Sequence, residues 1–240
     1  MSFLKIKKNN AYHSRFQVKW RRRREGKTDY YSRKRMICQD KRKYTSPKYR
    51  MVVRKTKKNI ICQFIQPKIE GDHVLSVVYS KNLKDFGIPL SYTSFPSSYL
   101  SGLLLGKTIS KNKFLQLKKK IKNEKPFLKP IYAILDIGLG RTTTGHKIFA
   151  AMKGAIDGGI AIPHKETRFP KQPGESHVNT EKDSINSRVQ GHQIAEYMES
   201  IKEEDEDFYI RQFSSAVKEK IEPKSFVLIF QKGFEAINSQ

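Results

Sequence analysis

The sequence has little cysteine and no long apolar run. Its two cysteines, Cys38 and Cys62, are too few for a disulfide framework or a zinc site, and both are expected to be reduced, in the cytosol or the nucleus. The longest apolar runs, 131–135 and 226–230, are far shorter than a membrane-spanning helix requires. The first residues lack the apolar core of a secretory signal peptide. These absences argue against a disulfide-rich secreted protein and a membrane-spanning one.

Acidic residues are scarce near the N-terminus. Residues 1–60 hold 22 Lys or Arg and three acids, a net charge of +19. The whole chain of 240 residues carries +25, which leaves +6 for the other 180. Such a concentration of positive charge indicates a polyanionic partner, which is RNA, DNA or an anionic membrane. The membrane fits poorly, because the basic segment has no sustained apolar helical face.

The most basic stretch, residues 20–35, also contains aromatic residues. Eight of its sixteen residues are Lys or Arg, and Trp20, Tyr30 and Tyr31 lie among them. Such a segment repels itself and is not expected to fold alone. Guanidinium groups bind phosphate in bidentate fashion, and aromatic rings stack on unpaired bases. The arginines alone would suit a flexible arm or a nuclear-import signal. The interleaved rings, and basic residues that continue to Lys58, favour nucleic acid.

Residue patterning after this segment predicts a three-stranded antiparallel meander. Residues 1–48 are expected to form a basic extension. Alternating or apolar runs at 49–54, 60–66 and 73–80, separated by short turns, predict the strands. The first strand places Met51 and Val53 on one face and Arg50 and Arg54 on the other, which is expected to face solvent.

The remaining elements predict an α/β fold with a mixed sheet covered mainly on one face. A helix is expected from about residue 94, followed by a lysine-rich stretch, 107–129, with a short helix at 113–122. A buried strand at 131–137, a Gly/Thr-rich loop and a helix at 146–157 form a strand-loop-helix unit. These elements would complete an α/β core of residues 49–165. Residues 166–240 are expected to form a loop and a helical C-terminal region. The loop is predicted to extend over 163–181, and the helices at 187–201, at 205–220 and from Pro223.

The loop after the expected strand 131–137 resembles nucleotide-binding motifs only in part. Gly140 and Gly145 have P-loop spacing, but His146 replaces the lysine and Ile148 the magnesium-binding hydroxyl. A dinucleotide fingerprint would need glycine in place of Thr143. Carboxylates and histidines elsewhere show no metal-ligand spacing. No cofactor and no enzymatic activity are therefore expected.

Two interpretations of this loop remain open, and both can hold. A glycine-rich turn before a helix exposes backbone N–H groups and Arg141, which suits an RNA phosphate. The alternative is a tight strand-to-helix turn capped by Thr143 or Thr144.

Ten sequence blocks carry a resemblance to a known family. They are residues 20–35 (WRRRREGKTDYYSRKR), 47–54 (PKYRMVVR), 59–63 (NIICQ), 69–72 (IEGD), 102–105 (GLLL), 139–145 (LGRTTTG), 153–159 (KGAIDGG), 162–164 (IPH), 168–170 (RFP) and 203–207 (EEDED). In this order, the blocks resemble the eukaryotic L-five branch of the universal L-eighteen family of large-subunit ribosomal proteins.

The resemblance implies a structural protein that binds 5S rRNA through its N-terminal arm and catalyses nothing. It further implies contact with large-subunit rRNA and a 5S particle shared with the neighbouring L-eleven ribosomal protein. Assembly in the nucleus and residence in cytoplasmic ribosomes would follow. The segment 107–130 is shorter and richer in lysine than is usual for the family. The chain also ends at Gln240 without the family's long basic tail, so the contacts of both parts are not expected here.

The expected RNA-binding residues come from the basic stretch, the first strand and the Gly/Thr-rich loop. They are Trp20, Arg21, Arg22, Arg23, Arg24, Lys27, Thr28, Tyr30, Tyr31, Arg33, Lys34, Arg35, Arg50, Arg54, Arg141, Thr142 and Thr143. The alternative function is that of a DNA-binding or chromatin-associated protein, although no recognition-helix motif supports it.

Overall fold

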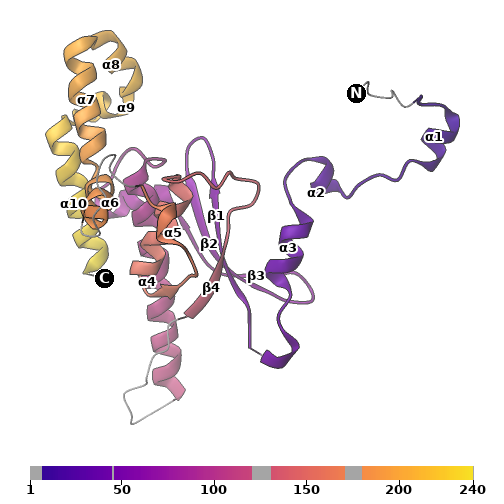
Figure 1. The fold of residues 1–240 in the computed structure, drawn as a ribbon. Helices are drawn as coiled ribbons and strands as arrows, with labels where there is room; N and C mark the ends of the chain where they lie inside the picture. Colours follow the sequence, from indigo (N-terminus) through magenta and orange to yellow (C-terminus); the bar gives the residue numbers. More distant parts are fainter. Residues whose placement is uncertain (1–6, 45, 121–130, 171–179, 240) are drawn as a thin grey trace.

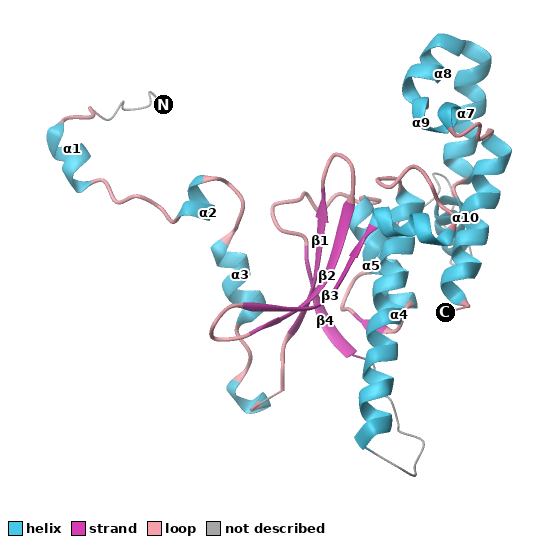
Figure 2. Ribbon diagram, turned by 180° about the vertical axis from the view of Figure 1, so that it is seen from behind, coloured by secondary structure: helices cyan, strands magenta, loops and turns pink. Residues whose placement is uncertain are grey.

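The computed structural model describes residues 7–44, 46–120, 131–170 and 180–239. A five-stranded sheet lies at its centre in the order β3-β2-β1-β4-β5 (Figure 1). The strands are β1 (Tyr49–Lys55), β2 (Ile60–Pro67), β3 (Asp72–Tyr79), β4 (Ile131–Asp136) and β5 (Ile160–Ala161). Helices α4 (Phe95–Lys120) and α5 (Lys147–Asp157) cover one face of this sheet (Figure 2). The expected mixed α/β fold is confirmed.

The sheet combines the expected meander with a parallel half. β1 pairs antiparallel with β2, which pairs antiparallel with β3. On its other edge β1 pairs in parallel with β4, and β4 with β5. The strand boundaries lie within about a residue of those expected. β5 was not foreseen, because a strand of two residues is too short to produce a pattern.

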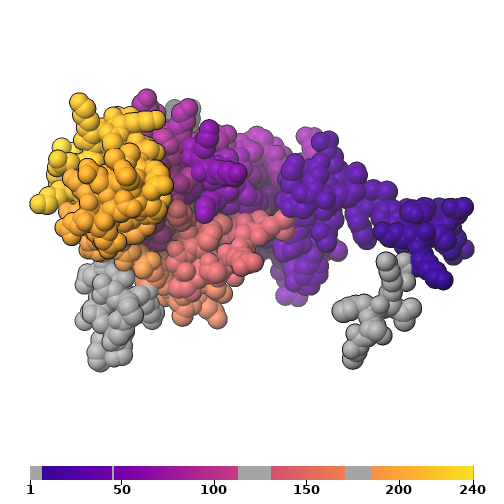
Figure 3. Space-filling view, turned by 90° about the horizontal axis from the view of Figure 1, so that it is seen from above, coloured from indigo at the N-terminus to yellow at the C-terminus, as the bar shows by residue number. Residues whose placement is uncertain are grey.

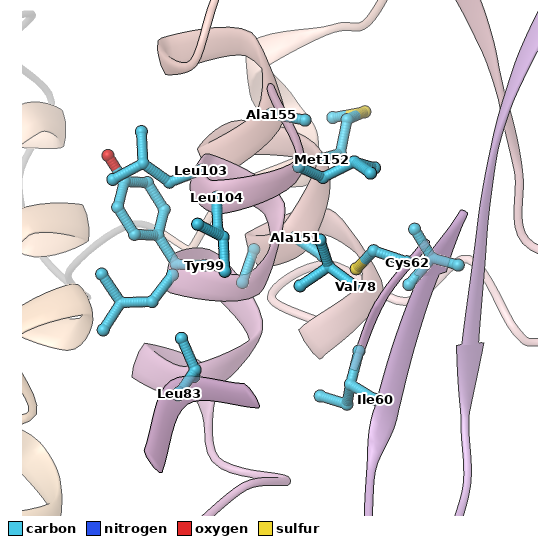
Figure 4. Packing of buried hydrophobic residues seen from close by; sticks show 14 of the residues in the cluster. Ile60, Cys62, Val78, Leu83, Tyr99, Leu103, Leu104, Ala151, Met152 and Ala155 are labelled. Atoms are coloured by element: carbon cyan, nitrogen blue, oxygen red, sulfur yellow. The ribbon is translucent and has the colours of Figure 1, made fainter. Parts of the chain in front are cut away.

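The hydrophobic core lies between the sheet and the helices α4 and α5. Cys62 from β2 and Val78 from β3 point toward Ala151 and Met152 of α5 (Figure 4). Met51 and Val53 also belong to this core, as the alternation of β1 predicted. The alternation in β1 thus correctly predicted the face of the sheet that packs against α4 and α5.

Glycines let the backbones of α4 and α5 touch. A Cβ on Gly102 would lie 1.9 Å from the Ala151 carbonyl oxygen, and one on Gly154 would lie 2.0 Å from that of Tyr99. α4 is one continuous helix of 26 residues, so the expected break before a second helix at 113–122 is wrong. The lysine-rich stretch consists mostly of good helix formers and contains no proline before residue 126. Residues 121–130 of the expected lysine-rich segment lie outside the described residues.

The C-terminal helices pack on the side of α4 and extend the core. They are α6 (Thr180–Gln190), α7 (His192–Glu204), α8 (Glu206–Gln212), α9 (Ser214–Lys218) and α10 (Pro223–Asn238). The helix expected at 187–201 is divided at Gly191, whose φ of +88° ends α6. The one expected at 205–220 is divided at Phe213. Pro223 begins α10, as expected.

Two short 3₁₀ helices complete the body. They are η2 (Ser80–Phe86) and η3 (Glu166–Arg168). η3 lies inside the loop expected over 163–181, of which residues 171–179 lie outside the described residues.

The N-terminal arm contains short helices where an extended segment was expected. These are α1 (Asn10–Arg15), α2 (Arg21–Arg24), α3 (Tyr30–Ile37) and the 3₁₀ helix η1 (Lys41–Lys43). Asn9, Asp29 and Asp40 cap α1, α3 and η1 with their side chains, and such caps stabilise helix starts. The arm and the C-terminal helices lie at opposite ends of the molecule (Figure 3).

Candidate nucleic-acid interface

The four arginines of α2 are exposed and remain largely free of acidic partners. Arg21 Nε donates to Glu25 Oε1 at 2.9 Å, Arg22 Nε to the Thr28 hydroxyl at 2.9 Å, and Arg24 Nε to the Lys19 carbonyl at 3.0 Å. Each contact uses Nε, so the terminal nitrogens of these guanidinium groups have no partner within the described residues. They are the donors that a phosphate group accepts in pairs.

Aromatic rings lie directly beside these cations. Trp20 is 73% exposed, and its ring meets Tyr30 edge-on at 5.2 Å between centroids. Tyr31 is exposed as well, and the Arg35 guanidinium lies 3.8 Å above its ring. The arm therefore presents apolar rings and positive charges on one short segment, a combination suited to unpaired nucleotides.

A tight turn follows β4. Gly138 has a φ of +63°, and a Cβ there would lie 2.9 Å from Cζ of Arg54, so this position requires glycine. Farther along the loop, the Arg168 guanidinium donates to the Thr142 carbonyl at 2.9 Å. The side chains of Arg141, Thr142 and Thr143 are exposed. The loop is thus held by its backbone while its side chains remain available.

His146 caps α5, so the expected cap by Thr143 or Thr144 is wrong. Its Nδ1 accepts the N–H of Ile148 at 3.2 Å, whereas both threonines precede the cap position. Burial, with smaller contributions from Lys55 and Lys147, lowers the pKa of His146. The lowered pKa favours the neutral ring, which the acceptor role of Nδ1 requires.

The arm and the loop meet at one pocket. Leu139 lines a cavity of about 690 Å³ together with Trp20, Arg23, Tyr30 and Tyr31. Two segments more than a hundred residues apart in the sequence therefore form one surface. We call this the arm–loop surface. It consists of Trp20, Arg21, Arg22, Arg23, Arg24, Lys27, Thr28, Tyr30, Tyr31, Leu139, Arg141, Thr142 and Thr143. Leu139 was not foreseen, because an isolated leucine in a loop carries no signal.

The expectation that Arg50 faces solvent is wrong. Its side chain is 2% exposed, and its terminal nitrogens donate to Asp136 Oδ2 at 2.6 Å and to Asp72 Oδ2 at 2.8 Å. Arg54 is 41% exposed and donates to Asp136 Oδ1 at 2.8 Å. The alternation of β1 is correct, but α3 covers this second face.

Arg33, Lys34 and Arg35 lie on α3, between the arm–loop surface and the sheet. Arg33 Nη2 lies 2.8 Å from Asp72 Oδ2, so this arginine already has a carboxylate partner. Asp72 and Asp136 were not foreseen as its neighbours, because their pairing depends on how distant segments meet.

The described residues contain neither a metal-ligand cluster nor a membrane-spanning helix. In the ranges that the structure covers, no group of three or more His, Cys, Asp or Glu side chains is arranged to hold a metal ion. No helix in those ranges is long and apolar enough to cross a bilayer.

Comparison with known proteins shows which family the chain resembles. The family model described as "Ribosomal large subunit proteins 60S L5, and 50S L18" matches residues 14–165. The Large ribosomal subunit protein uL18 of Caenorhabditis elegans is 43% identical over 252 residues, which cover 100% of this chain and 85% of that protein. The protein of the same name from Bombyx mori is 40% identical over 251 residues, 100% of this chain and 83% of the relative. That of Dictyostelium discoideum is 43% identical over 253 residues, 100% and 85% respectively.

The family resemblance read from the ten sequence blocks is confirmed by these matches. The family consists of ribosomal components that are not enzymes. The chain belongs to the family of ribosomal large subunit proteins 60S L5 and 50S L18.

Proposed function

We propose that this chain binds 5S rRNA within the large ribosomal subunit through its arm–loop surface. The observation that carries the proposal is the meeting of Trp20, Arg23 and Tyr31 with Leu139, in the loop that also bears Arg141. Family membership supplies the ribosomal context.

Each part of the arm–loop surface has a distinct chemical role in this proposal. The α2 arginines neutralise phosphates and release condensed counterions, which drives association. Trp20 and Tyr31 stack on bases that are not paired in the folded RNA. The threonine hydroxyls and Arg141 of the loop contact the sugar–phosphate backbone and fix the orientation of the RNA.

We infer a division of the chain that follows from these roles. Residues 1–48 bind RNA, the α/β core of residues 49–165 holds the arm, and residues 166–240 form the loop and the C-terminal helices. Large-subunit rRNA and the neighbouring L-eleven ribosomal protein are the further partners. Assembly in the nucleus and work in the cytoplasmic ribosome belong to the same proposal.

A competition assay tests the proposal against DNA binding. The full chain is bound to labelled 5S rRNA, and unlabelled 5S rRNA, an unrelated structured RNA and duplex DNA of equal length compete. We expect 5S rRNA to compete most strongly. If duplex DNA competes as well as 5S rRNA, a DNA-binding function is favoured instead. Sequencing of RNA that co-purifies with the chain gives an independent answer.

A further inference from the structure

The helix α3 is attached to the sheet by polar contacts. None of its residues, all of which the structure describes, is fully buried. Tyr30, Met36 and Ile37 are half-buried, and polar contacts tie both ends of the helix to the sheet. At its far end the Lys48 ammonium donates to the carbonyls of Arg35 and Cys38, at 2.9 and 2.6 Å. These carbonyls belong to the last turn of the helix, where backbone acceptors lack intrahelical partners.

A chain of alternating charges holds the other end of α3. Arg33 on the helix contacts Asp72 at the start of β3, at 2.8 Å. The same oxygen of Asp72 accepts from Arg50 on β1 at 2.8 Å. Arg50 contacts Asp136 at the end of β4, and Asp136 contacts Arg54. We call these five side chains the carboxylate ladder: Arg33, Asp72, Arg50, Asp136 and Arg54.

The burial of Arg50 explains why two carboxylates lie beside it. A guanidinium group removed from water must be compensated by carboxylates. Even with two of them, its Nε has no partner within the described part of the chain. Tyr30, Ser32 and Met36 of α3 line the cavity above it. Asp72 therefore couples a charge inside the sheet to the position of the arm.

We propose that Asp72 positions the N-terminal arm for RNA binding. α3 begins with Tyr30 and Tyr31 of the arm–loop surface, so fixing α3 fixes the direction in which Trp20 and the α2 arginines are presented. An arm ordered before it meets RNA loses less conformational entropy on binding. The effect on affinity rests on the function proposed above, whereas the anchoring of α3 can be measured without RNA.

Two opposing effects on the affinity for RNA are expected when Asp72 loses its charge. Asp72→Asn raises the net charge of the protein by one, which by electrostatics alone strengthens binding to RNA. Loss of the carboxylate that holds Arg33 acts in the opposite direction. We expect the second effect to dominate and the affinity for 5S rRNA to fall about tenfold, as for the loss of one charged hydrogen bond.

Three variants separate positioning from charge. Asp72→Asn breaks the ladder, and Asp72→Glu keeps a carboxylate and should largely restore affinity. Asp85→Asn is the matched control, because Asp85 is exposed and forms no ion pair among the described residues. It adds the same charge without touching the ladder, and we expect its affinity to equal or slightly exceed that of the unmodified chain.

Amide hydrogen exchange of the full chain without RNA provides the second readout. In Asp72→Asn, we expect exchange to accelerate in residues 30–37, with the protection of β1 and β2 retained. Arg33→Gln cuts the ladder at the helix and leaves the Arg50–Asp72 pair intact, so it should accelerate exchange in the same residues.

The exchange data test the anchoring of α3, and the affinities test its role in RNA binding. Unchanged exchange of α3 in both Asp72→Asn and Arg33→Gln overturns the anchoring by Asp72. If exchange in α3 is faster in Asp72→Asn but the affinity of this variant for 5S rRNA rises as in Asp85→Asn, the role of Asp72 in RNA binding is overturned. If the unmodified chain does not bind 5S rRNA, the proposed function fails, and the exchange comparison still decides whether the ladder holds the arm.

Discussion

Arg50 and Asp136 form a buried ion pair across two parallel strands, although 86 residues separate them in the chain. Arg50 Nη1 lies 2.6 Å from Asp136 Oδ2. The other oxygen of Asp136 accepts from Arg54 and from the backbone N–H of Gly138, at 2.8 and 2.9 Å. One carboxylate therefore ties β1 to β4 and sets the first turn of the loop that carries Arg141.

Removal of this carboxylate should destabilise the fold. Asp136→Asn leaves the buried guanidinium of Arg50 without its closest partner, and we expect the free energy of unfolding in urea to fall by about 3 kcal/mol. The control Asp85→Asn changes an exposed carboxylate and should leave the urea midpoint in place. A loss below about 1 kcal/mol in Asp136→Asn would mean that the pair contributes no more than a surface one.

The contact between α4 and α5 should be intolerant of a single methyl group. In Gly154→Ala the new Cβ meets the Tyr99 carbonyl oxygen at 2.0 Å, and we expect a loss of about 3 kcal/mol, because backbone must move. Gly233→Ala is the matched comparison. Its Cβ meets the Cδ1 atom of Ile88 at 2.5 Å, and this side-chain end can turn aside. Equal losses in thermal or urea unfolding would contradict the distinction.

Local patterns in the sequence were sufficient for most of the fold. Alternation placed Met51 and Val53 in the core, and Pro223 marked the start of α10, because both signals depend only on neighbouring residues. The breaks at Gly191 and Phe213 were missed, since helical periodicity continues across both positions.

For the candidate site, the sequence indicated the arm but not the surroundings of Arg50. Dense charge and aromatic residues were enough to propose the arm as the RNA-binding segment. The burial of Arg50 was missed, because an arginine on a strand looks the same whether a helix covers that face or not. The partners Asp72 and Asp136 lie far away in the sequence, and only the register of the strands brings them to Arg50.

The cap of α5 should make stability depend on pH. The pKa of His146 is lowered in the folded protein from its ordinary value of 6.5. Above about pH 6.5, His146 is neutral in both the folded and the unfolded chain, so it contributes no pH dependence. As the pH falls below 6.5, the unfolded chain takes up the proton first, and the free energy of unfolding decreases.

His146→Asn keeps a capping side chain and removes the titration. We expect the decrease in urea midpoint between about pH 7.5 and about pH 5.5 to be smaller in this variant. An identical decrease in the variant and the unmodified chain would rule out His146 as a source of the dependence.

Trp20 is the only tryptophan of the chain, and it should report directly on RNA binding. Stacking on a base is expected to quench its fluorescence during titration with 5S rRNA. Trp20→Ala should weaken binding by about 1–3 kcal/mol, the range for one stacked base. Tyr132→Ala alters an exposed ring on β4, outside both residues 1–48 and the arm–loop surface, and should bind normally. Fluorescence that does not change at saturation would place Trp20 away from the RNA.

The salt dependence of binding tests the central claim most directly. The affinity for 5S rRNA is measured over a range of salt concentrations for the unmodified chain and for a variant with Arg21, Arg22, Arg23 and Arg24 changed to Gln. In the control, four exposed lysines outside the arm–loop surface are changed to Gln, namely Lys81, Lys84, Lys218 and Lys224. This control has the same net charge as the arginine variant. At about 0.7–0.9 per phosphate contact, the arginine variant should lose about three units of log–log slope, and the lysine control should keep its slope. Equal slopes in the unmodified chain and the arginine variant would contradict the claim that the arm binds the RNA.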